Sequence, residues 1–325
     1  MVSVQPQQLP DLPWHDVIYQ HIFPRLSVVE LCRLAAVSRA FHRVSKEYFH
    51  TCKEIDVSDY NMTDDDFRMI TLECRNLQRL SVARCSWLSD GPLITLFRQS
   101  PNLVYVDLRG CCSLNGGALQ ILAVKCKKLK FLLVDGCPWF TGGSLQALTL
   151  HQVHSPPCSF GSNSPLPSPV LELAVLRAGG TNGLEHMNNT SFQSELLSFS
   201  TGGCWGMEDQ DIAKFFQKFT KIKEIRLNDV EAITDASLYH LAMSCSDLET
   251  LSLAGCWRVT DQGLKKVVDS CSKMQCLDVR RCSKVSEKFL CCLHTTGLKI
   301  TSNYPLADMI RSRKHVDRLM INVQI

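Results

Sequence analysis

Apolar residues recur along most of the chain in one pattern with a fixed spacing. The pattern is an apolar residue, two variable residues, a second apolar residue, one variable residue, a third apolar residue, two variable residues and usually a cysteine. Neighbouring copies end 26 residues apart, except for 25 between the first pair and 67 across one interval. The end positions are Tyr60, Cys85, Cys111, Cys137, Cys204, Val230, Cys256 and Cys282. Such a period indicates a solenoid of stacked units.

The residues that follow each cysteine predict a short helix. A Ser or Thr followed by Asp, as in Ser89-Asp90 and Thr260-Asp261, is typical of a helix N-terminus because the side-chain oxygens accept otherwise unpaired backbone N–H groups. Apolar residues such as Leu238 and Leu241 then recur at helical spacing. The sequence therefore predicts an α/β fold, a right-handed β–α solenoid of the leucine-rich-repeat type with a curved parallel sheet in a horseshoe shape.

Most of the seventeen cysteines follow the repeat. One column is the pattern's last position, and a second column (Cys74, Cys126, Cys245, Cys271) precedes the next copy by three residues. Cysteine is a small residue that is readily buried, so we expect structural thiols inside the solenoid. Zinc or redox chemistry is the alternative, but no C-x-x-C or H-x-x-x-H pair supports it. Disulfides between stacked neighbours are within geometric reach, and a reducing compartment disfavours them.

One interval breaks the period, between Cys137 and Cys204. Its first part, from about residue 151 to 169, is rich in Ser, Pro, Gly and His without periodicity, which is typical of a loop or a disordered insert. A later stretch matches the pattern with Ala178 in the cysteine position. Two readings stay open in equal measure: a degenerate repeat at 170–195, or an insertion that covers 150–195.

The N-terminal residues 9–50 do not follow the repeat. Their apolar residues lie at helical spacing, and Pro24 interrupts the pattern, which predicts at least two short helices rather than one. About forty residues bury little surface alone, so a helical cap over the first repeat is one interpretation.

The same residues resemble the F-box, the motif of cullin-based ubiquitin ligases that binds an adaptor. Leu12-Pro13 and Val37-Ser38-Arg39 carry the resemblance, with Phe41 where the family usually has Trp and Ser38 where it usually has Cys. In that family the apolar residues of paired helices dock into a groove on Skp1. The resemblance implies that the Skp1-binding residues are Leu12, Pro13, Val17, Ile18, Ile22, Leu26, Leu31, Val37 and Phe41.

An F-box followed by cysteine-marked repeats of 26 residues is similar to the F-box/leucine-rich-repeat family. This resemblance implies a substrate receptor of an SCF ubiquitin ligase: Skp1 links the F-box to Cul1 and a RING subunit, and the repeats bind the protein to be ubiquitinated and degraded by the proteasome. One member of the family is associated with HECT-type ubiquitin ligases of the BMP pathway, which implies one class of target. The chain itself would supply no catalytic residue and would act by proximity.

The residues between the apolar strand positions should face the concave side of the sheet. Among them, Tyr105, Phe131 and Leu133 are large apolar side chains on adjacent strands, and aromatic residues beside arginine are typical of binding hot spots. The alternative is that the insert or the C-terminal tail covers this patch. The predicted target-binding residues are Tyr105, Asp107, Arg109, Phe131, Leu133 and Asp135.

Composition narrows the function further. The chain has 325 residues, 45% hydrophobic and 21% charged, with a net charge of +3, so charge gives no argument for nucleic acid or an anionic membrane. No apolar run is long enough to span a bilayer and no secretory signal is visible, so we expect a cytoplasmic protein. No nucleotide-binding, hydrolase or zinc-protease motif appears, and we expect no cofactor. A scaffold without ligase function and a redox or zinc protein are the alternatives.

The predicted organisation follows from these patterns. It comprises a flexible N-terminus at 1–8, the F-box at 9–50, repeats at 51–149, the insert at 150–195, further repeats at 196–300 and a C-terminal cap or tail at 301–325.

Overall fold

The computed structural model describes residues 14–149, 195–204, 206–293 and 297–303. The predictions for Leu12, Pro13, Ala178, most of the insert and residues 304–325 lie outside these ranges. The strands are β1 (Glu54–Asp56), β2 (Arg79–Ser81), β3 (Tyr105–Asp107), β4 (Phe131–Leu133), β5 (Ser198–Ser200), β6 (Glu224–Arg226), β7 (Thr250–Ser252), β8 (Cys276–Asp278) and β9 (Lys299–Thr301). The repeat helices are α3 (Asp64–Thr71), α4 (Asp90–Gln99), α5 (Gly117–Lys125), α6 (Gly142–Thr149), α8 (Asp209–Lys218), α9 (Asp235–Ser244), α10 (Asp261–Ser270) and α11 (Glu287–Leu293).

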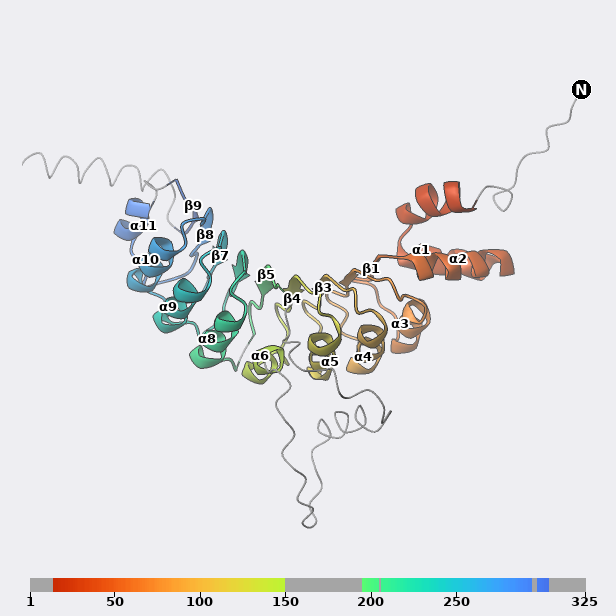
Figure 1. Ribbon diagram of the computed structural model, residues 1–325, viewed down its shortest axis with the longest axis horizontal. Coiled ribbons are helices and arrows are strands. Elements are labelled where there is room, and N and C mark those ends of the chain that lie inside the picture. Colours follow the sequence, from red (N-terminus) through yellow and green to blue (C-terminus); the bar gives the residue numbers. More distant parts are fainter. Residues whose placement is uncertain (1–13, 150–194, 205, 294–296, 304–325) are drawn as a thin grey trace, which may run out of the picture.

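The strands form one parallel sheet in the order of the sequence, from β1 to β9. Each strand contributes three residues, and the register pairs equivalent positions of neighbouring repeats, as in Leu80 with Val106. Figure 1 shows the resulting arc, with the strands on the inner, concave side and the helices on the outer side. The predicted curved α/β solenoid of the leucine-rich-repeat type, with one strand per repeat, is confirmed.

The core lies between the sheet and the helices. The middle residue of each strand points into it, and Ile55, Leu80, Val106 and Leu132 are fully buried. Leucines from the inner faces of the helices, such as Leu264 in α10, pack against this row. A single repeat cannot bury its apolar face alone, so the stack as a whole forms one continuous core.

The sheet continues directly across the long interval in the repeat. β4 pairs with β5, with Leu132 opposite Phe199, and α6 packs against α8. This pairing leaves no place between β4 and β5 for a further strand, such as one from the stretch that ends at Ala178. Of the two readings of this interval, an extra rung of the sheet is therefore contradicted.

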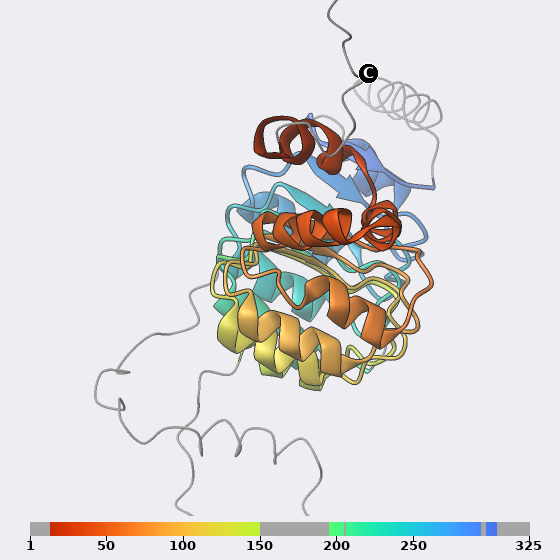
Figure 2. The ribbon, with the colours of Figure 1, turned by 90° about the vertical axis from the view of Figure 1, so that its right-hand side faces the viewer.

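The N-terminal module is helical and lies at the first end of the arc, where its helices cross in front of the repeats in an end-on view (Figure 2). It comprises η2 (Trp14–Ile22, a π-helix), η3 (Phe23–Arg25, a 3-10 helix), α1 (Val28–Val37) and α2 (Arg39–Thr51). The chain turns at Pro24, as predicted. Ser27 and Glu30 form a capping box that begins α1, and the Ser38 hydroxyl accepts a hydrogen bond from the Phe41 N–H at the start of α2.

Each strand from β1 to β8 is followed by a residue in the left-handed region, immediately before the position that ends the repeat pattern. This conformation turns the chain out of the sheet, and glycine adopts it at least cost, as Gly255 does at φ +80°. The equivalent residues are Asp59, Arg84, Gly110, Gly136, Gly203, Asp229, Gly255 and Arg281.

Candidate functional site: the concave face and the F-box surface

The cysteine column that ends each repeat pattern is an internal ladder. Each thiol is buried and donates a weak hydrogen bond to a backbone carbonyl of the preceding repeat, as from Cys111 Sγ to Val82 O at 3.0 Å and from Cys256 Sγ to Leu227 O at 3.0 Å. All ten column cysteines are buried and none forms a disulfide, so the prediction of structural thiols is confirmed. The remaining acceptors are Val57 for Cys85, Leu108 for Cys137, Val134 for Cys204 and Leu253 for Cys282.

Burial also makes these thiols poor nucleophiles and poor metal ligands. Loss of solvent raises the pKa of Cys111, Cys126 and Cys256 to about 12, so the reactive thiolate is almost absent at neutral pH. Among residues that the structure describes, no three His, Cys, Asp or Glu side chains group closely enough to hold a metal ion.

The side chains predicted to form the F-box divide into buried and accessible ones. Ile18 is completely buried and Leu31 is 3% exposed, and both side chains pack in the hydrophobic core. Val37, at the end of α1, is 71% exposed and is the most accessible of the predicted residues that the structure describes. The half-buried predicted residues are Val17, Ile22, Leu26 and Phe41.

The accessible F-box side chains include one that the motif did not indicate. Trp14 is half-buried and meets Phe41 edge to face, with ring centroids 6.0 Å apart. The pair joins the start of η2 to the first turn of α2, and Val37 is the last residue of α1. An aromatic pair with an exposed aliphatic neighbour is a typical apolar docking surface.

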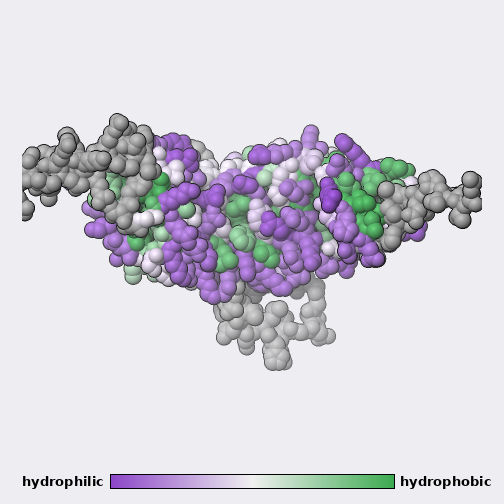
Figure 3. Space-filling view, turned by 90° about the horizontal axis from the view of Figure 1, so that it is seen from above, coloured by the Kyte–Doolittle hydropathy of each residue, from purple (hydrophilic) through white to green (hydrophobic). Residues whose placement is uncertain are grey.

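On the concave face, the structure brings the predicted aromatic residues together. Tyr105 and Phe131 are direct partners in neighbouring strands, and their ring centroids are 6.0 Å apart. Leu133 lies on the same face of β4, and all three side chains are half-buried, so each keeps accessible surface. Figure 3, which looks onto the concave face, shows a largely hydrophilic surface interrupted by smaller hydrophobic areas.

Arg79 extends this patch, although the sequence reasoning did not include it. Its guanidinium lies over the Tyr105 ring, 4.3 Å from the centroid, and its Nε donates to Glu54 at 3.2 Å. Because Arg79 is opposite Tyr105 in the sheet register, the 26-residue period was the signal that could have identified it. We define the aromatic patch as Arg79, Tyr105, Phe131 and Leu133.

Asp107 has an internal role rather than an exposed one. Its side chain is 2% exposed, and its oxygens accept from the Arg109 backbone N–H at 3.1 Å, from Arg109 Nε at 2.9 Å and from Arg109 Nη2 at 2.6 Å. In this structure its side chain offers almost no surface to a target. It fixes Arg109, whose side chain is 48% exposed at the edge of the aromatic patch.

Asp135 is also engaged within the protein. One carboxylate oxygen accepts from Ser200 Oγ at 2.6 Å and from the Gly202 N–H at 2.7 Å, so it connects the fourth repeat to the fifth. A side chain at position 202 would lie 2.8 Å from that oxygen, which explains the glycine there. Asp135 thus stabilises the junction where the long interval leaves the repeat, and only part of its surface remains for a partner.

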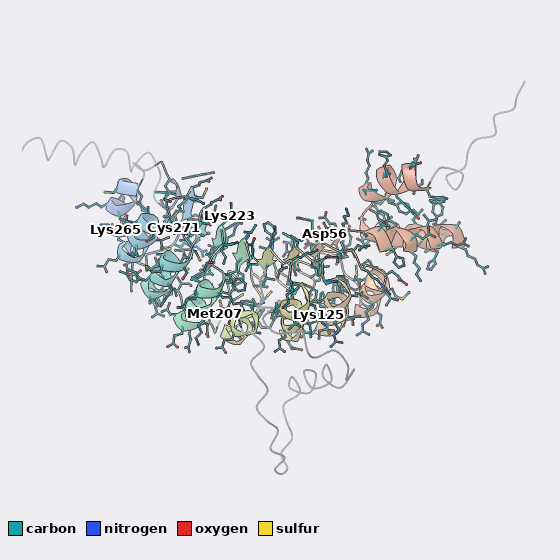
Figure 4. All side chains as sticks on the ribbon, viewed as in Figure 1. Asp56, Lys125, Met207, Lys223, Lys265 and Cys271 are labelled. Carbon is teal, nitrogen blue, oxygen red and sulfur yellow. The ribbon has the colours of Figure 1, made fainter. Side chains whose placement is uncertain are left out.

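Elsewhere on the concave face, charged side chains pair with one another within the protein. Arg226 binds Glu224, and Arg280 binds Asp278 within its own strand region. Asp56 and Lys223 mark this side in Figure 4, while Lys125 and Met207 lie toward the helical side. The aromatic patch is thus the part of the concave face where apolar area dominates.

The stacked repeats, the parallel sheet and the buried cysteine ladder define a leucine-rich-repeat solenoid. A leucine-rich-repeat family model matches residues 244–268, which span the end of α9 through most of α10. F-box/LRR-repeat protein 15 of Mus musculus is 31% identical over 104 residues, which cover 31% of this chain and 35% of that protein. The Rattus norvegicus protein of the same name is 30% identical over an equally long stretch, covering 31% and 35%. The chain thus spans about a third of the length of the curated relatives it matches, and these matches support the resemblance to F-box/leucine-rich-repeat proteins.

Two solved structures are also similar to this chain. The yeast Rad7–Elc1 complex matches with 14% identity and a TM-score of 0.34, covering 85% of this chain and 83% of that one. An internalin C2 of Listeria monocytogenes matches with 13% identity and a TM-score of 0.44, covering 85% and 92%.

Within the described residues, none of the helices has the length and apolar character needed to cross a membrane.

Proposed function

We propose that the chain is the substrate receptor of an SCF ubiquitin ligase, with the F-box bound to Skp1 and the concave face bound to the target. The observation that supports this most directly is the presence of two separate accessible apolar surfaces in one chain. One is the F-box surface around Val37 and Phe41, and the other is the aromatic patch. A receptor needs two such surfaces, because it holds the adaptor and the target at the same time.

In this proposal the chain binds the adaptor and the target, and other subunits catalyse ubiquitin transfer. The column thiols have pKa values raised far above neutral, and the carboxylates of the aromatic-patch region are engaged in internal bonds. The chain therefore contributes binding surfaces, while a RING subunit and its E2, joined through Skp1 and Cul1, carry out ubiquitin transfer. A cytoplasmic location and proteasomal degradation of the target go with this proposal.

Skp1 binding is tested by charge at the F-box surface. Val37→Asp should weaken binding of purified Skp1 at least about tenfold, because it places a carboxylate in an apolar groove contact. Met243→Asp is the matched control, since Met243 is 75% exposed on α9 and far from the F-box. Equal Skp1 affinity of wild type and Val37→Asp, measured by calorimetry, would refute the F-box assignment.

Target capture is tested at the aromatic patch. In cells in which the proteasome is blocked, proximity labelling should mark the target beside the wild-type chain. The Tyr105→Ala/Phe131→Ala double variant should no longer label the target, while its binding of Skp1 stays intact. A Tyr239→Ala variant, which removes an aromatic residue from α9, is the matched control. Unchanged labelling by the double variant would show that targets bind elsewhere, or that the insert or the C-terminal tail covers the patch.

The nature of the target is a finer proposal. A HECT-type ubiquitin ligase of the BMP pathway is the candidate that the family resemblance offers. A scaffold without ligase function is the second candidate. It predicts that deletion of residues 9–50 leaves the labelling of the target unchanged. It also predicts that this deletion does not change the cellular level of the target.

A further inference from the structure

A groove of about 530 Å³ lies outside the two surfaces of the proposed function. It is formed by the segments that follow β5, β6 and β7, at the edge of the solenoid where the chain passes from strand to helix. Its floor contains the buried residues Met207 and Val230, and its walls include Glu208, Glu231 and Trp257. The aromatic patch, by contrast, lies on β2, β3 and β4.

Two of the repeats that line the groove have small residues at this edge, Gly206 and Ala232. Trp87 and Trp139 occupy the second position after the cysteine column in their repeats, and each donates its indole N–H to a carbonyl of the preceding repeat, at 2.7 Å and 2.5 Å. Ala232 occupies the same position after Val230 and fills far less space. Neither Gly206 nor Ala232 carries a ring that could fill the groove.

Trp257 forms one wall of this hollow and differs from the other two tryptophans. It is 48% exposed, and no described residue accepts a hydrogen bond from its indole N–H. Lys284 Nζ lies 5.6 Å from the centroid of its ring. The ring therefore already interacts with a cation, which an aromatic face attracts through its quadrupole.

The charge of the groove has one dominant sign. Four carboxylates line it, from Glu208, Asp209, Asp229 and Glu231, against the single guanidinium of Arg258. Arg281 neutralises Asp229 through a contact of 2.9 Å. Asp209 accepts only from uncharged donors, including the Thr234 N–H at 3.1 Å, so its charge remains.

Glu231 is the most available of these carboxylates. It is exposed, it follows Val230 directly, and no described cation pairs with it. A cationic side chain in the groove would meet this carboxylate, the residual charge of Glu208 and Asp209, and the accessible indole of Trp257. Charge complementarity of this kind raises both the association rate and the specificity for basic partners.

We infer that this acidic groove binds a basic, extended segment of a partner protein, with a Lys or Arg side chain held between Glu231 and Trp257. The site is independent of Skp1 and of the aromatic patch. It gives the chain a third contact surface, on a different edge of the solenoid, with a preference for positive charge.

The test uses the full chain and a fluorescein-labelled peptide, Gly-Lys-Arg-Gly-Arg-Lys-Gly, with the same peptide carrying Glu at the four basic positions as a control. Fluorescence anisotropy should show binding of the basic peptide that weakens as salt rises, and no binding of the acidic one. Glu231→Lys should weaken binding by at least about tenfold, because it turns an attraction into a repulsion, and Trp257→Ala by about fivefold.

Matched controls distinguish the groove from general surface charge. Asp269→Lys changes the same charge on the outer face of α10, and Tyr239→Ala removes an exposed ring from α9, so both should bind the basic peptide within about twofold of wild type. Equal losses in these controls, or unchanged affinity in Glu231→Lys, would overturn the inference.

The chain's own C-terminal residues are the competing occupant, because residues 311–318 contain Arg311, Arg313, Lys314 and Arg318. An Arg313→Glu/Lys314→Glu variant should bind the basic peptide like wild type. A tenfold gain in affinity would show that the tail occupies the groove, and would overturn the assignment to a partner. Skp1 binding should be unchanged in every variant, so failure here and failure of the proposed function give different results.

Discussion

The interior columns of the solenoid and the positions on its concave face share one period but obey different rules. In the interior, the same residue type returns in repeat after repeat, and its partner lies one repeat back. Cys137 bonds Leu108, and Cys282 bonds Leu253, at 3.0 and 3.1 Å. On the concave face, equivalent positions hold Arg79, Tyr105 and Phe131. Repetition thus marks positions that the stack needs, and variation marks positions that are available for binding.

The largest test of this difference is alkaline pH, which acts on the buried thiols of the interior columns. Burial raises the pKa of Cys74, Cys111, Cys137 and Cys245 to about 12, whereas an unfolded thiol titrates near 9. Between these values the unfolded chain has lost protons that the folded chain retains, so stability falls as pH rises. Each buried thiol contributes a loss of about 1.4 kcal/mol per pH unit above 9.

Urea denaturation at pH 8, 9.5 and 10.5 measures this loss. We expect the urea midpoint to fall steeply over this pH range. In Cys111→Ala, the slope of the free energy of unfolding against pH should be smaller by the equivalent of one proton. A midpoint that stays constant to pH 10.5 would contradict the buried ladder. A second measurement is thiol labelling of the folded protein at pH 8. The exposed Cys112 should react before any column cysteine.

The next test compares two phenylalanines on neighbouring strands. Phe199 is 1% exposed and stacks on Phe215 at 4.4 Å between centroids, whereas Phe131 is half-buried on the concave face. Phe199→Ala should reduce the free energy of unfolding by about 3–5 kcal/mol, through lost burial and a cavity. Phe131→Ala should cost about 1 kcal/mol or less and act on target capture instead. Similar losses from both changes would remove the distinction between the two regions.

The aspartates of the Ser/Thr-Asp pairs form a further column along the solenoid. The sequence predicted only part of the role of this column, whereas it predicted the burial of the cysteine columns in full. The Ser/Thr-Asp pairs were predicted to cap their own helix, and Thr260 does accept from the Gln262 N–H at 3.2 Å. The preceding repeat's Asp235, however, accepts from the Thr260 N–H at 2.9 Å and from Thr260 Oγ1 at 2.6 Å. Each such aspartate thus connects two successive helix starts, a contact visible only once the repeats are stacked.

The aspartate ladder gives a test of intermediate size. Asp235→Ala should cost about 1–3 kcal/mol, because it leaves the Thr260 N–H and hydroxyl without their acceptor. Asp269→Ala, on the outer face of α10, should stay within about 0.5 kcal/mol of wild type. Thermal and urea unfolding measure both, and an equal effect of the two variants would show that the ladder adds nothing to stability.

The sequence predicted the interior columns well and the contacts on the concave face poorly. The period and the apolar pattern specified one rung per repeat, the buried cysteines and the break at Pro24, because each depends on local spacing and burial. The burial of Asp107 and the engagement of Asp135 were not predicted. Arg109 binds Asp107 from two residues away, through a side-chain conformation that the spacing of residues does not specify. Gly202 reaches Asp135 across 67 residues of sequence, because the fold brings the two repeats together. The stacking of Arg79 on Tyr105 is of the same kind.

The smallest expected effect concerns Val230, the one residue that interrupts the cysteine column within the second group of repeats. It is 1% exposed, and the column's regular offset of 29 residues would place the Thr201 carbonyl as acceptor if a thiol stood there. Val230→Cys should therefore change the free energy of unfolding by less than about 1 kcal/mol, because a weak hydrogen bond replaces lost methyl contacts. Cys256→Ala, which removes a thiol and its bond to Leu227 without replacement, should cost about 1–2 kcal/mol. If Val230→Cys destabilises as strongly as Cys256→Ala, the column requires a particular shape at each repeat and a buried small residue is not sufficient.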